Sequence, residues 1–378
     1  MNLLLFRKLL FTTILLSSLA NCFSQNIKLS KKALVSIITC DTGNESYSLF
    51  GHTAIRIKDE ANNFDAVYNY GAFDFATPNF VAKFVKGDLQ YFAVASTFFD
   101  FMSQYSYEKR SVYEQELNIP LIYKQKIYDN LTHTLASSES FYTYKFIDKN
   151  CTSMVVEILN KNLGSNIIVK KVDTEKTYRS ILFPYFEGSF FEKLGTSIIF
   201  GNKVDEEGNR IFLPLELHKS LKLISFRNNL LCKESIVLLN FKKETGSSIW
   251  NNFYIFSILL GFIILVNKRG IDLFYFSIMG ILGVFFVFVG FYSLHKELTY
   301  NYNILLFNPI LLALVYSILR KNSKWTVNLC LINLGFLLIY LILMINKIHL
   351  LIVTPLIVTN VILLIKTISR NWKRIIII

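Results

Sequence analysis

The side chains best suited to covalent chemistry are a cysteine and a histidine that lie far apart in the chain. Cys151 follows the polar residue Asn150 in the segment KNCTSMVVEIL, and His52 follows Gly51 in the segment SLFGHTAIRI. A thiol becomes an effective nucleophile when a neighbouring base takes its proton, and histidine commonly serves as that base. The pair therefore predicts a thiol nucleophile, Cys151, with His52 as its general base. Each residue alone is also compatible with a structural role, Cys151 as an inert buried thiol.

The position of Cys151 depends on a helix that is expected to begin at that residue. Asp148 or Asn150 can cap the N-terminus of this helix, and Gly164 can end it. A thiol in the first turn feels the positive end of the helix dipole, which favours the thiolate. One buried face of the helix is expected to carry Cys151, Met154, Val155, Ile158 and Leu159.

The position of His52 depends on a strand. Residues 48–57 alternate, so His52, Ala54 and Arg56 share one face, and Gly51 permits a bulge just before His52. A preceding strand is expected at Lys32–Cys40. The buried face of the helix then directs Cys151 toward the sheet on which His52 lies.

The remaining exported sequence alternates between short strands and helices. Together the elements predict an α+β domain over residues 25–248. The further strands are expected at Val67–Tyr70, Tyr91–Ser96, Val112–Ile119 and Tyr142–Phe146, and the further helices at Asn79–Val85 and Ile122–Ser137.

The composition of the chain points to the membrane. Of the 378 residues, 52% are hydrophobic and only 18% are charged, and the apolar excess is concentrated after Ser248. This excludes a disordered chain, a disulfide-rich miniprotein and a cytosolic enzyme. Residues 249–378 are expected to form a transmembrane domain whose five helices, each near the ~20 residues that a bilayer needs, span Trp250–Val266, Leu273–Leu294, Ile304–Leu319, Thr326–Ile345 and Ile348–Ile365.

Two signals agree on the orientation of these spans. Residues 1–24 have a basic start, an apolar stretch and a small residue, Ser24, as in a secretory signal peptide. Lipidation of Cys22 is the alternative, but Asn21 precedes this cysteine where a lipidation motif has Gly, Ala or Ser, so a cleaved signal peptide is favoured. With residues 25–248 outside, the loops that fall inside the cell carry most of the basic residues, which satisfies the positive-inside rule. These are Lys268, Arg269, Arg320, Lys321 and Lys324, with Arg370, Lys373 and Arg374 in the tail.

Composition and spacing also limit the partners and cofactors. The net charge of +13 comes from basic residues at the ends of apolar helices, and no nucleic-acid-binding motif is present, so we expect no nucleic-acid partner. No spacing of His, Cys and carboxylates predicts a metal, and we expect no cofactor. Asp205, His133 and His218 are expected to be structural. Whether Cys40 pairs with Cys232 stays open.

The motifs resemble a known family. The order of His before Cys is similar to that of circularly permuted papain-like enzymes, including the lecithin-retinol acyltransferase relatives. More closely, the exported domain followed by a membrane tail resembles the Lnb family of bacterial lipoprotein N-acyltransferases. The stretches that carry this resemblance are Tyr47–Arg56, the Tyr-x-Tyr-x-Phe-x-x-x-Asn-Cys-Thr run that ends at Thr152, Gly201–Pro214 and Phe291–Pro309.

The resemblance implies transfer of an acyl chain from a phospholipid donor to the α-amine of a diacylated lipoprotein acceptor. It implies an enzyme of the bacterial inner membrane, with its N-terminal domain in the periplasm and its substrates in the lipid bilayer. Cys151 is then the nucleophile and His52 the base, and helix N-terminal N–H groups stabilise the oxyanion. Asn150 serves either as a cap or as a catalytic orienting residue.

The same resemblance suggests residues for substrate binding. Tyr47 and Arg56 lie near His52 in sequence, and either can orient the histidine or hold a phosphate; an ion pair is the alternative for Arg56. His295, Asn301 and Asn303 belong to the outside loop, where they can meet a lipid headgroup. The alternative for these three is that they satisfy helix ends or solvate the interface.

Two other functions remain open at the level of sequence. A membrane-tethered cysteine amidase or peptidase acting on cell-wall peptides needs the same Cys151 and His52, with water or another amine as acceptor. A non-catalytic membrane assembly protein needs neither residue to be reactive.

Overall fold

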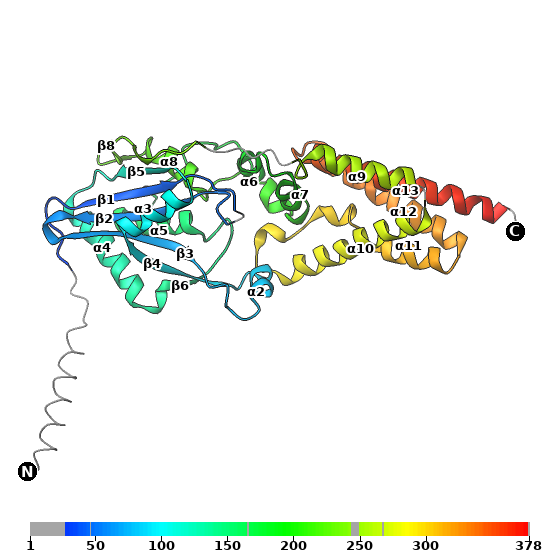
Figure 1. Cartoon of the computed structure of the whole chain (residues 1–378), viewed down its shortest axis with the longest axis horizontal. Helices are drawn as coiled ribbons and strands as arrows, with labels where there is room; N and C mark the ends of the chain where they lie inside the picture. Colours follow the sequence, from blue (N-terminus) through cyan, green and yellow to red (C-terminus); the bar gives the residue numbers. More distant parts are fainter. Residues whose placement is uncertain (1–26, 46, 165, 243–248, 267, 377–378) are drawn as a thin grey trace, which may run out of the picture.

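The computed structural model describes residues 27–45, 47–164, 166–242, 249–266 and 268–376. The predicted signal peptide, including Cys22, lies outside the described residues. Figure 1 shows a sheet domain at one end of the molecule and a group of long helices at the other. This arrangement confirms the prediction of an N-terminal α+β domain followed by a helical region.

A seven-stranded antiparallel sheet frames the N-terminal domain (Figure 1), in the order β6-β4-β3-β2-β1-β5-β9. Antiparallel neighbours need only short connections, and four of the strands follow one another across the centre as a meander. The strands are β1 (Leu34–Cys40), β2 (His52–Asp59), β3 (Phe64–Ala72), β4 (Gln90–Thr97), β5 (Val112–Glu116), β6 (Phe141–Thr143) and β9 (Ile236–Leu239).

Several strands are shorter than the sequence predicts, including β1 and β5, and the differences in β2 and β6 shape the site. β2 begins at His52 because Gly51 has a φ of +81°, a left-handed conformation that turns the chain at that point. β6 ends at Thr143, since the backbone of Lys145 pairs with that of Lys149 in a tight turn. The predicted strand over Tyr142–Phe146 is therefore wrong in its second half, and the turn brings the chain directly to Cys151.

Helices cover both faces of the sheet. On one face, α4 (Leu121–Ala136) and α5 (Cys151–Leu163) bury Ile55 and Ile57 of β2 in the main core. On the other face, α3 (Phe98–Tyr107) packs on the side that includes Ala54. The predicted alternation along β2 is confirmed by this division. The predicted helices over Ile122–Ser137 and from Cys151 to Gly164 are confirmed as α4 and α5.

A third group of elements lies between the sheet and the long helices. Its small apolar core contains Ile147, Tyr178, Phe186 and Phe212, all buried. The remaining short helices are α2 (Phe80–Lys86), α6 (Tyr178–Leu182), α7 (Phe190–Ile199), α8 (Pro214–Leu221), η2 (Glu60–Asn62), η3 (Ser138–Ser140), η4 (Phe183–Phe186) and η5 (Asn202–Asp205), and the strands β7 (Ser225–Phe226) and β8 (Asn229–Leu230) pair with each other.

Within the described residues, four segments are long and apolar enough to cross a membrane, at 269–292, 296–319, 323–344 and 350–373. Three of them correspond to α10 (Arg269–Tyr292), α12 (Ser323–Met344) and α13 (Leu350–Ile376). The other joins η6 (Lys296–Leu298), η7 (Tyr302–Leu305) and α11 (Ile310–Leu319). The predicted first span, Trp250–Val266, corresponds to α9 (Phe253–Val266), whose 14 residues are fewer than the ~20 of a full span.

A buried polar cluster ties the membrane region to the N-terminal domain. Arg179 of α6 donates to Asp205 at 2.7 Å, and Tyr302 donates to the same carboxylate at 2.6 Å. His349, between α12 and α13, lies 3.1 Å from the Tyr302 hydroxyl, and Lys347 is 3.3 Å from Asp205. Asp205 therefore has the structural role predicted for it, but at the junction between the two parts of the chain.

Close packing of α10 on the chain before α11 generates a prediction. A Cβ at Gly283 would lie 1.9 Å from the backbone oxygen of Phe307, whereas a Cβ at Gly335 of α12 would meet nothing within 4 Å. Overpacking of this kind costs about 1–3 kcal/mol. We expect Gly283→Ala to lower the melting temperature of the detergent-solubilised protein by several degrees, and Gly335→Ala to leave it unchanged or raise it. Equal melting temperatures for the two variants would contradict the close contact.

Candidate functional site

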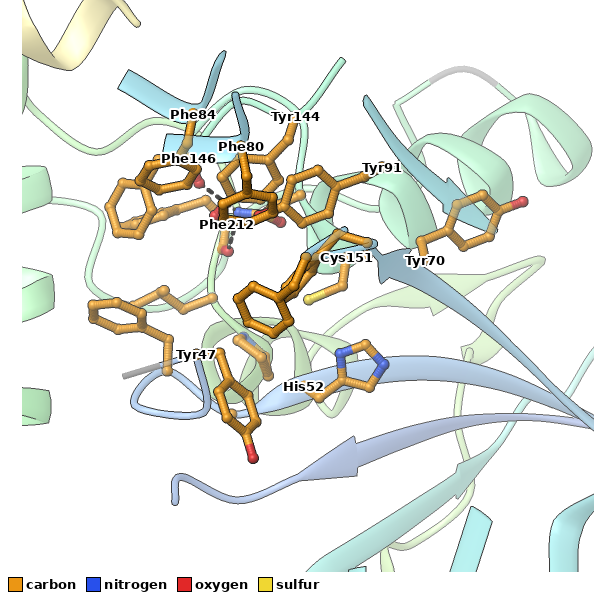
Figure 2. A pocket seen from close by; sticks show the side chains of 18 residues that line it. Tyr47, His52, Tyr70, Phe80, Phe84, Tyr91, Tyr144, Phe146, Cys151 and Phe212 are labelled. Carbon is orange, nitrogen blue, oxygen red and sulfur yellow. Dashed lines mark hydrogen bonds between the residues drawn. The ribbon is translucent and has the colours of Figure 1, made fainter. Parts of the chain in front are cut away.

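An apolar cavity lies where the start of α5 meets the end of the sheet (Figure 2). Its volume is about 440 Å³, within the range of small-molecule sites. Cys151 and His52 both line it. Most of the remaining wall is aromatic, with Phe73, Phe80, Phe84, Tyr91, Tyr144 and Phe146 among the lining side chains. The cavity therefore offers a nucleophile to a ligand with a large apolar part.

Cys151 is the first residue of α5, as its sequence context predicts. Thr152, the next residue, is buried, and its hydroxyl lies 3.1 Å from that of Thr53 on β2. This contact fixes the start of the helix against the strand that begins with His52. Near Cys151, Gly71 of β3 has a φ of +110°, a conformation that favours glycine, and a Cβ there would be in ordinary contact with that of Cys151.

The structure brings His52 and Cys151 together at the cavity wall, close enough for the imidazole to lower the pKa of the thiol. Figure 2 shows the imidazole beside the Cys151 sulfur, on the floor of the cavity. The Nε2 atom of His52 lies 3.2 Å from the Oδ1 atom of Asn69, an acceptor, so Nε2 carries a proton and donates it. In the neutral ring Nδ1 is then unprotonated and suited to accept the proton of Cys151.

The electrostatic surroundings of Cys151 favour its thiolate. Burial by itself raises the pKa of this thiol, but the charge and hydrogen bond of His52 and the backbone N–H of Thr53 outweigh it, and the net pKa is below the ordinary value. In contrast, burial raises the pKa of Cys232 to about 12 and that of Cys40 further. Cys151 is thus the one thiol among these three that is activated.

Asn150 acts as the cap of α5. Its Oδ1 atom accepts from the backbone N–H groups of Thr152 and Ser153 at 2.9 and 3.0 Å. Its Nδ2 atom donates to the carbonyl oxygens of Phe146 and Phe212 at 2.7 and 2.9 Å. Both ends of the amide are occupied, which supports the capping alternative over a role as catalytic orienting residue.

Because Asn150 caps the helix, only some of the backbone N–H groups at the start of α5 are available to stabilise an oxyanion. The N–H groups of Thr152 and Ser153 are occupied by Asn150. The backbone N–H of Cys151 itself, at the first position of α5, has no intrahelical partner, and no hydrogen bond from it is found in the described part of the chain. The expected helix N-terminal oxyanion donor is therefore reduced to this one N–H.

Tyr47 and Arg56, the two candidates near His52, lie in different places. Tyr47 lines the cavity and is 63% exposed, so it stands at the mouth (Figure 2). Arg56 is buried away from the cavity lining, with its guanidinium 2.7 Å from Asp65 and 3.1 Å from Glu114. It also lies 3.3 Å from the Phe98 ring centroid. This environment supports the ion-pair alternative for Arg56.

The three loop candidates contact protein groups rather than the cavity. Asn301 donates to the carbonyl oxygens of Ile198 and Ile199 at 2.9 and 3.0 Å, and Asn303 donates to that of Ser197 at 3.2 Å. Both asparagines thus satisfy the C-terminal carbonyl groups of α7, as the structural alternative expected.

His295 contacts the C-terminal end of α2. Its Nε2 atom lies 3.0 Å from the carbonyl oxygen of Phe84, which can only accept, so the imidazole donates. Burial lowers the pKa of His295, although Glu297 opposes the shift. Since Phe84 lines the cavity, His295 is linked to the site through α2.

Asn69 and most of the aromatic wall are parts of the site that the sequence does not predict. Asn69 lies on β3, directly opposite Ala54 in register, which places it diagonally across from His52. A polar residue between the buried Tyr68 and Tyr70 was the available signal. The aromatic side chains of the wall come from residues 47–50, 70–91, 144–146 and 212, and their assembly depends on the turn at Lys145–Lys149 and on the docking of α2.

The described residues contain neither a disulfide nor a cluster that could hold a metal ion. Cys40, Cys151, Cys232 and Cys330 are all unpaired, so Cys40 and Cys232 do not form a disulfide. Across the described ranges, no group of three or more His, Cys, Asp or Glu side chains is placed to hold a metal ion.

Comparison with known proteins gives two matches. Residues 20–182 match the model of the Lnb N-terminal periplasmic domain, and residues 247–375 match that of the Lnb transmembrane domain. No curated protein and no solved structure matched the chain. The two matched ranges cover most of the sequence, in the order periplasmic domain then membrane domain, and the chain belongs to the Lnb family.

Proposed function

We propose that this protein is a thiol-dependent lipoprotein N-acyltransferase. The observation that carries the proposal is the series Cys151–His52–Asn69 at the wall of an aromatic cavity, in which Asn69 hydrogen-bonds to His52 and His52 lowers the pKa of Cys151. A thiol activated in this way suits acyl transfer, and an apolar cavity suits a fatty acyl chain. Membership of the Lnb family supports the same activity.

In the first half of the reaction, His52 Nδ1 takes the proton of the Cys151 thiol. The sulfur attacks the carbonyl carbon of a phospholipid ester, and the resulting oxyanion lies within reach of the Cys151 N–H. When the carbon–oxygen bond breaks, His52 returns the proton to the leaving alkoxide, and a lysophospholipid departs. The enzyme then holds the acyl chain as a thioester on Cys151.

In the second half, the α-amine of the diacylglyceryl-cysteine attacks the thioester carbon. His52 removes a proton from this amine, the carbon–sulfur bond breaks, and the thiolate of Cys151 is restored. The product is an amide, which is more stable than the thioester. Asn69 holds the imidazole in the tautomer that each half requires, as orienting partners do in other catalytic series.

The proposal includes the setting of the enzyme. The domain is periplasmic and the chain is anchored in the inner membrane, with five spans that include α9 as a short first crossing. The domain is of permuted papain-like type, with the histidine strand before the cysteine helix. Tyr47, at the cavity mouth, contacts the substrate; a phospholipid donor and a diacylated lipoprotein acceptor both reach the site from the bilayer.

The cavity distinguishes this function from the amidase or peptidase alternative. A cell-wall peptide carries many polar groups that need hydrogen-bond partners, and burial without them is costly. The wall at Cys151 consists mainly of aromatic side chains. A non-catalytic membrane assembly protein would not need a thiol with a lowered pKa, so the lowered pKa of Cys151 favours an enzyme.

The first prediction concerns the product. Cells that lack this protein and any other enzyme of the same activity are expected to accumulate diacylated lipoproteins. Wild-type protein should restore the third acyl chain, and Cys151→Ala should not, although Cys232→Ala should. Mass spectrometry of the N-terminal peptide of a reporter lipoprotein measures this. Triacylation by the Cys151→Ala protein would rule out the thioester mechanism, and altered peptidoglycan with normal lipoproteins would favour the amidase.

The second prediction concerns the thiol. Because the pKa of Cys151 is lowered, its alkylation by iodoacetamide should reach half its maximal rate below the ordinary thiol pKa of 9.0. In His52→Ala the lowering contributions of the imidazole are lost while burial remains, so the midpoint should move upward. At pH 7 the rate should fall at least about tenfold, as one pKa unit implies. An unchanged pH profile would show that His52 does not activate the thiol.

The third prediction concerns Asn69 as a positioning residue. Asn69→Ala should lower kcat by about 10- to 100-fold, a typical effect of removing an orienting partner, with the melting temperature little changed. Asn69→Asp retains an acceptor for Nε2 and should recover much of the rate, with an altered pH profile. Loss of activity that simply follows loss of folded protein would argue for a structural role.

A further inference from the structure

A second apolar groove lies close to the cavity, on the membrane side of α2. It is lined by Val284, Val287, Phe288, Phe291, Tyr292 and Pro309, at the end of α10 nearest the sheet domain, and its volume is about 580 Å³. Phe291 is 91% exposed and Phe288 is 56% exposed. Exposed apolar side chains on a spanning helix face lipid, so the groove opens toward the acyl chains of the bilayer.

α2 contacts both the cavity at Cys151 and the helix that carries this groove, α10. Figure 1 places α2 against the end of α10. Phe80 and Phe84 of α2 line the cavity, and Val81, between them, is 71% exposed. Two residues after Phe84, the Nζ atom of Lys86 lies 5.8 Å from the ring centroid of Tyr292, which lines the groove.

Hydrogen bonds from the segment after α10 fix α2 in this position. The Leu294 N–H donates to the carbonyl oxygen of Lys86 at 2.7 Å, and the Ser293 hydroxyl donates to that of Val85 at 2.7 Å. His295 donates to that of Phe84 at 3.0 Å. These three consecutive residues therefore hold the end of a seven-residue helix that is too short to be stable alone.

The charges on α2 suit a phosphate near the groove. Lys83 and Lys86 lie in its last turn, and the Lys145 side chain donates to the Gly87 carbonyl oxygen just beyond it. Asp88 is the acidic neighbour, with its carboxylate 2.5 Å from the Lys86 Nζ atom. Lys145 is balanced by Glu297 and Asp148 as well as Asp88. The two lysines of α2 outnumber Asp88, and this excess of positive charge attracts an anionic headgroup.

We propose that the end of α10 and α2 form the route by which one acyl chain of the donor phospholipid reaches Cys151. The chain leaves the bilayer along the groove at Phe288 and Tyr292, crosses α2 at Val81 and Phe84, and enters the aromatic cavity. Lys86 and Lys83 bind the phosphate of the same lipid. This inference rests on the proposed function, because only that function makes the bound phospholipid an acyl donor. The positive charge favours a phospholipid over the diacylglyceryl group of the acceptor, which has no phosphate.

The test uses binding rather than turnover. Full-length Cys151→Ser protein is placed in lipid nanodiscs that contain a phosphatidylglycerol with a diazirine on its acyl chain, and labelled peptides are identified after illumination. We expect label in α2 and in residues 142–146 as well as on α10. Val284→Trp fills the groove and should reduce the label at residues 142–146 at least about fivefold, as steric overpacking predicts. Ile281→Trp, on the exposed face of the same helix but outside the groove lining, should not.

Three results would overturn the route. Label that is confined to lipid-facing helices and absent from residues 142–146 would do so, as would equal labelling in the two tryptophan variants. Displacement of the label by a diacylated lipopeptide, but not by unlabelled phosphatidylglycerol, would assign the groove to the acceptor instead. If the label follows the expected pattern but wild-type protein leaves lipoproteins diacylated, the lipid route stands and the proposed function fails.

Discussion

The geometry of the site depends on one side-chain amide, that of Asn150, which caps α5 and also binds the two segments that meet at the start of this helix. The oxygen of this amide caps α5, and its nitrogen contacts the carbonyl oxygens of Phe146 and Phe212. A capping interaction contributes only about 1 kcal/mol. Its larger effect is geometric, because it holds the first turn of α5, the turn before it and the segment that precedes α8 at one point. The thiol of Cys151 is adjacent to that point, and its direction is set by all three.

Both apolar and polar contacts join the membrane region to the N-terminal domain. The apolar side chains of α7 pack against the core of the long helices. At the same junction the buried side chains of Arg179 and His349 are linked through Asp205 and Tyr302. Burial of such groups is costly unless the network is complete, and a network that tolerates few arrangements fixes orientation well. The asparagines of the same loop act similarly on α7. These contacts fix the orientation of the N-terminal domain relative to the long helices, as the proposed transfer between two lipid substrates would need.

Much of this arrangement follows from local sequence patterns. The cap and the apolar spacing after Cys151 predict α5, and Gly51 with the alternation after it predicts the strand of His52. The long apolar runs predict four membrane segments that the structure contains. Local patterns do not indicate which residue of β3 lies beside His52, because that depends on strand register. Local patterns also suggested that His295, Asn301 and Asn303 bind substrate. An exposed polar loop and a loop that caps another helix have the same composition, so the sequence does not distinguish them. The length of α9 shows a similar limit, because hydropathy alone does not define where a helix begins.

The contact between Asn150 and Phe212 has a consequence for where the catalytic unit ends. The match to the periplasmic family domain stops at residue 182, yet Phe212, Leu213 and Pro214 form part of the cavity wall, and Phe212 supplies one acceptor for the Asn150 amide. Farther along, β9 pairs with β5 at the sheet edge, and the backbone of Phe241 exchanges hydrogen bonds with Ser111. A fragment cut at residue 182 would therefore expose the cavity on one side and leave a sheet edge open. The N-terminal domain that encloses the cavity therefore extends at least to Phe241.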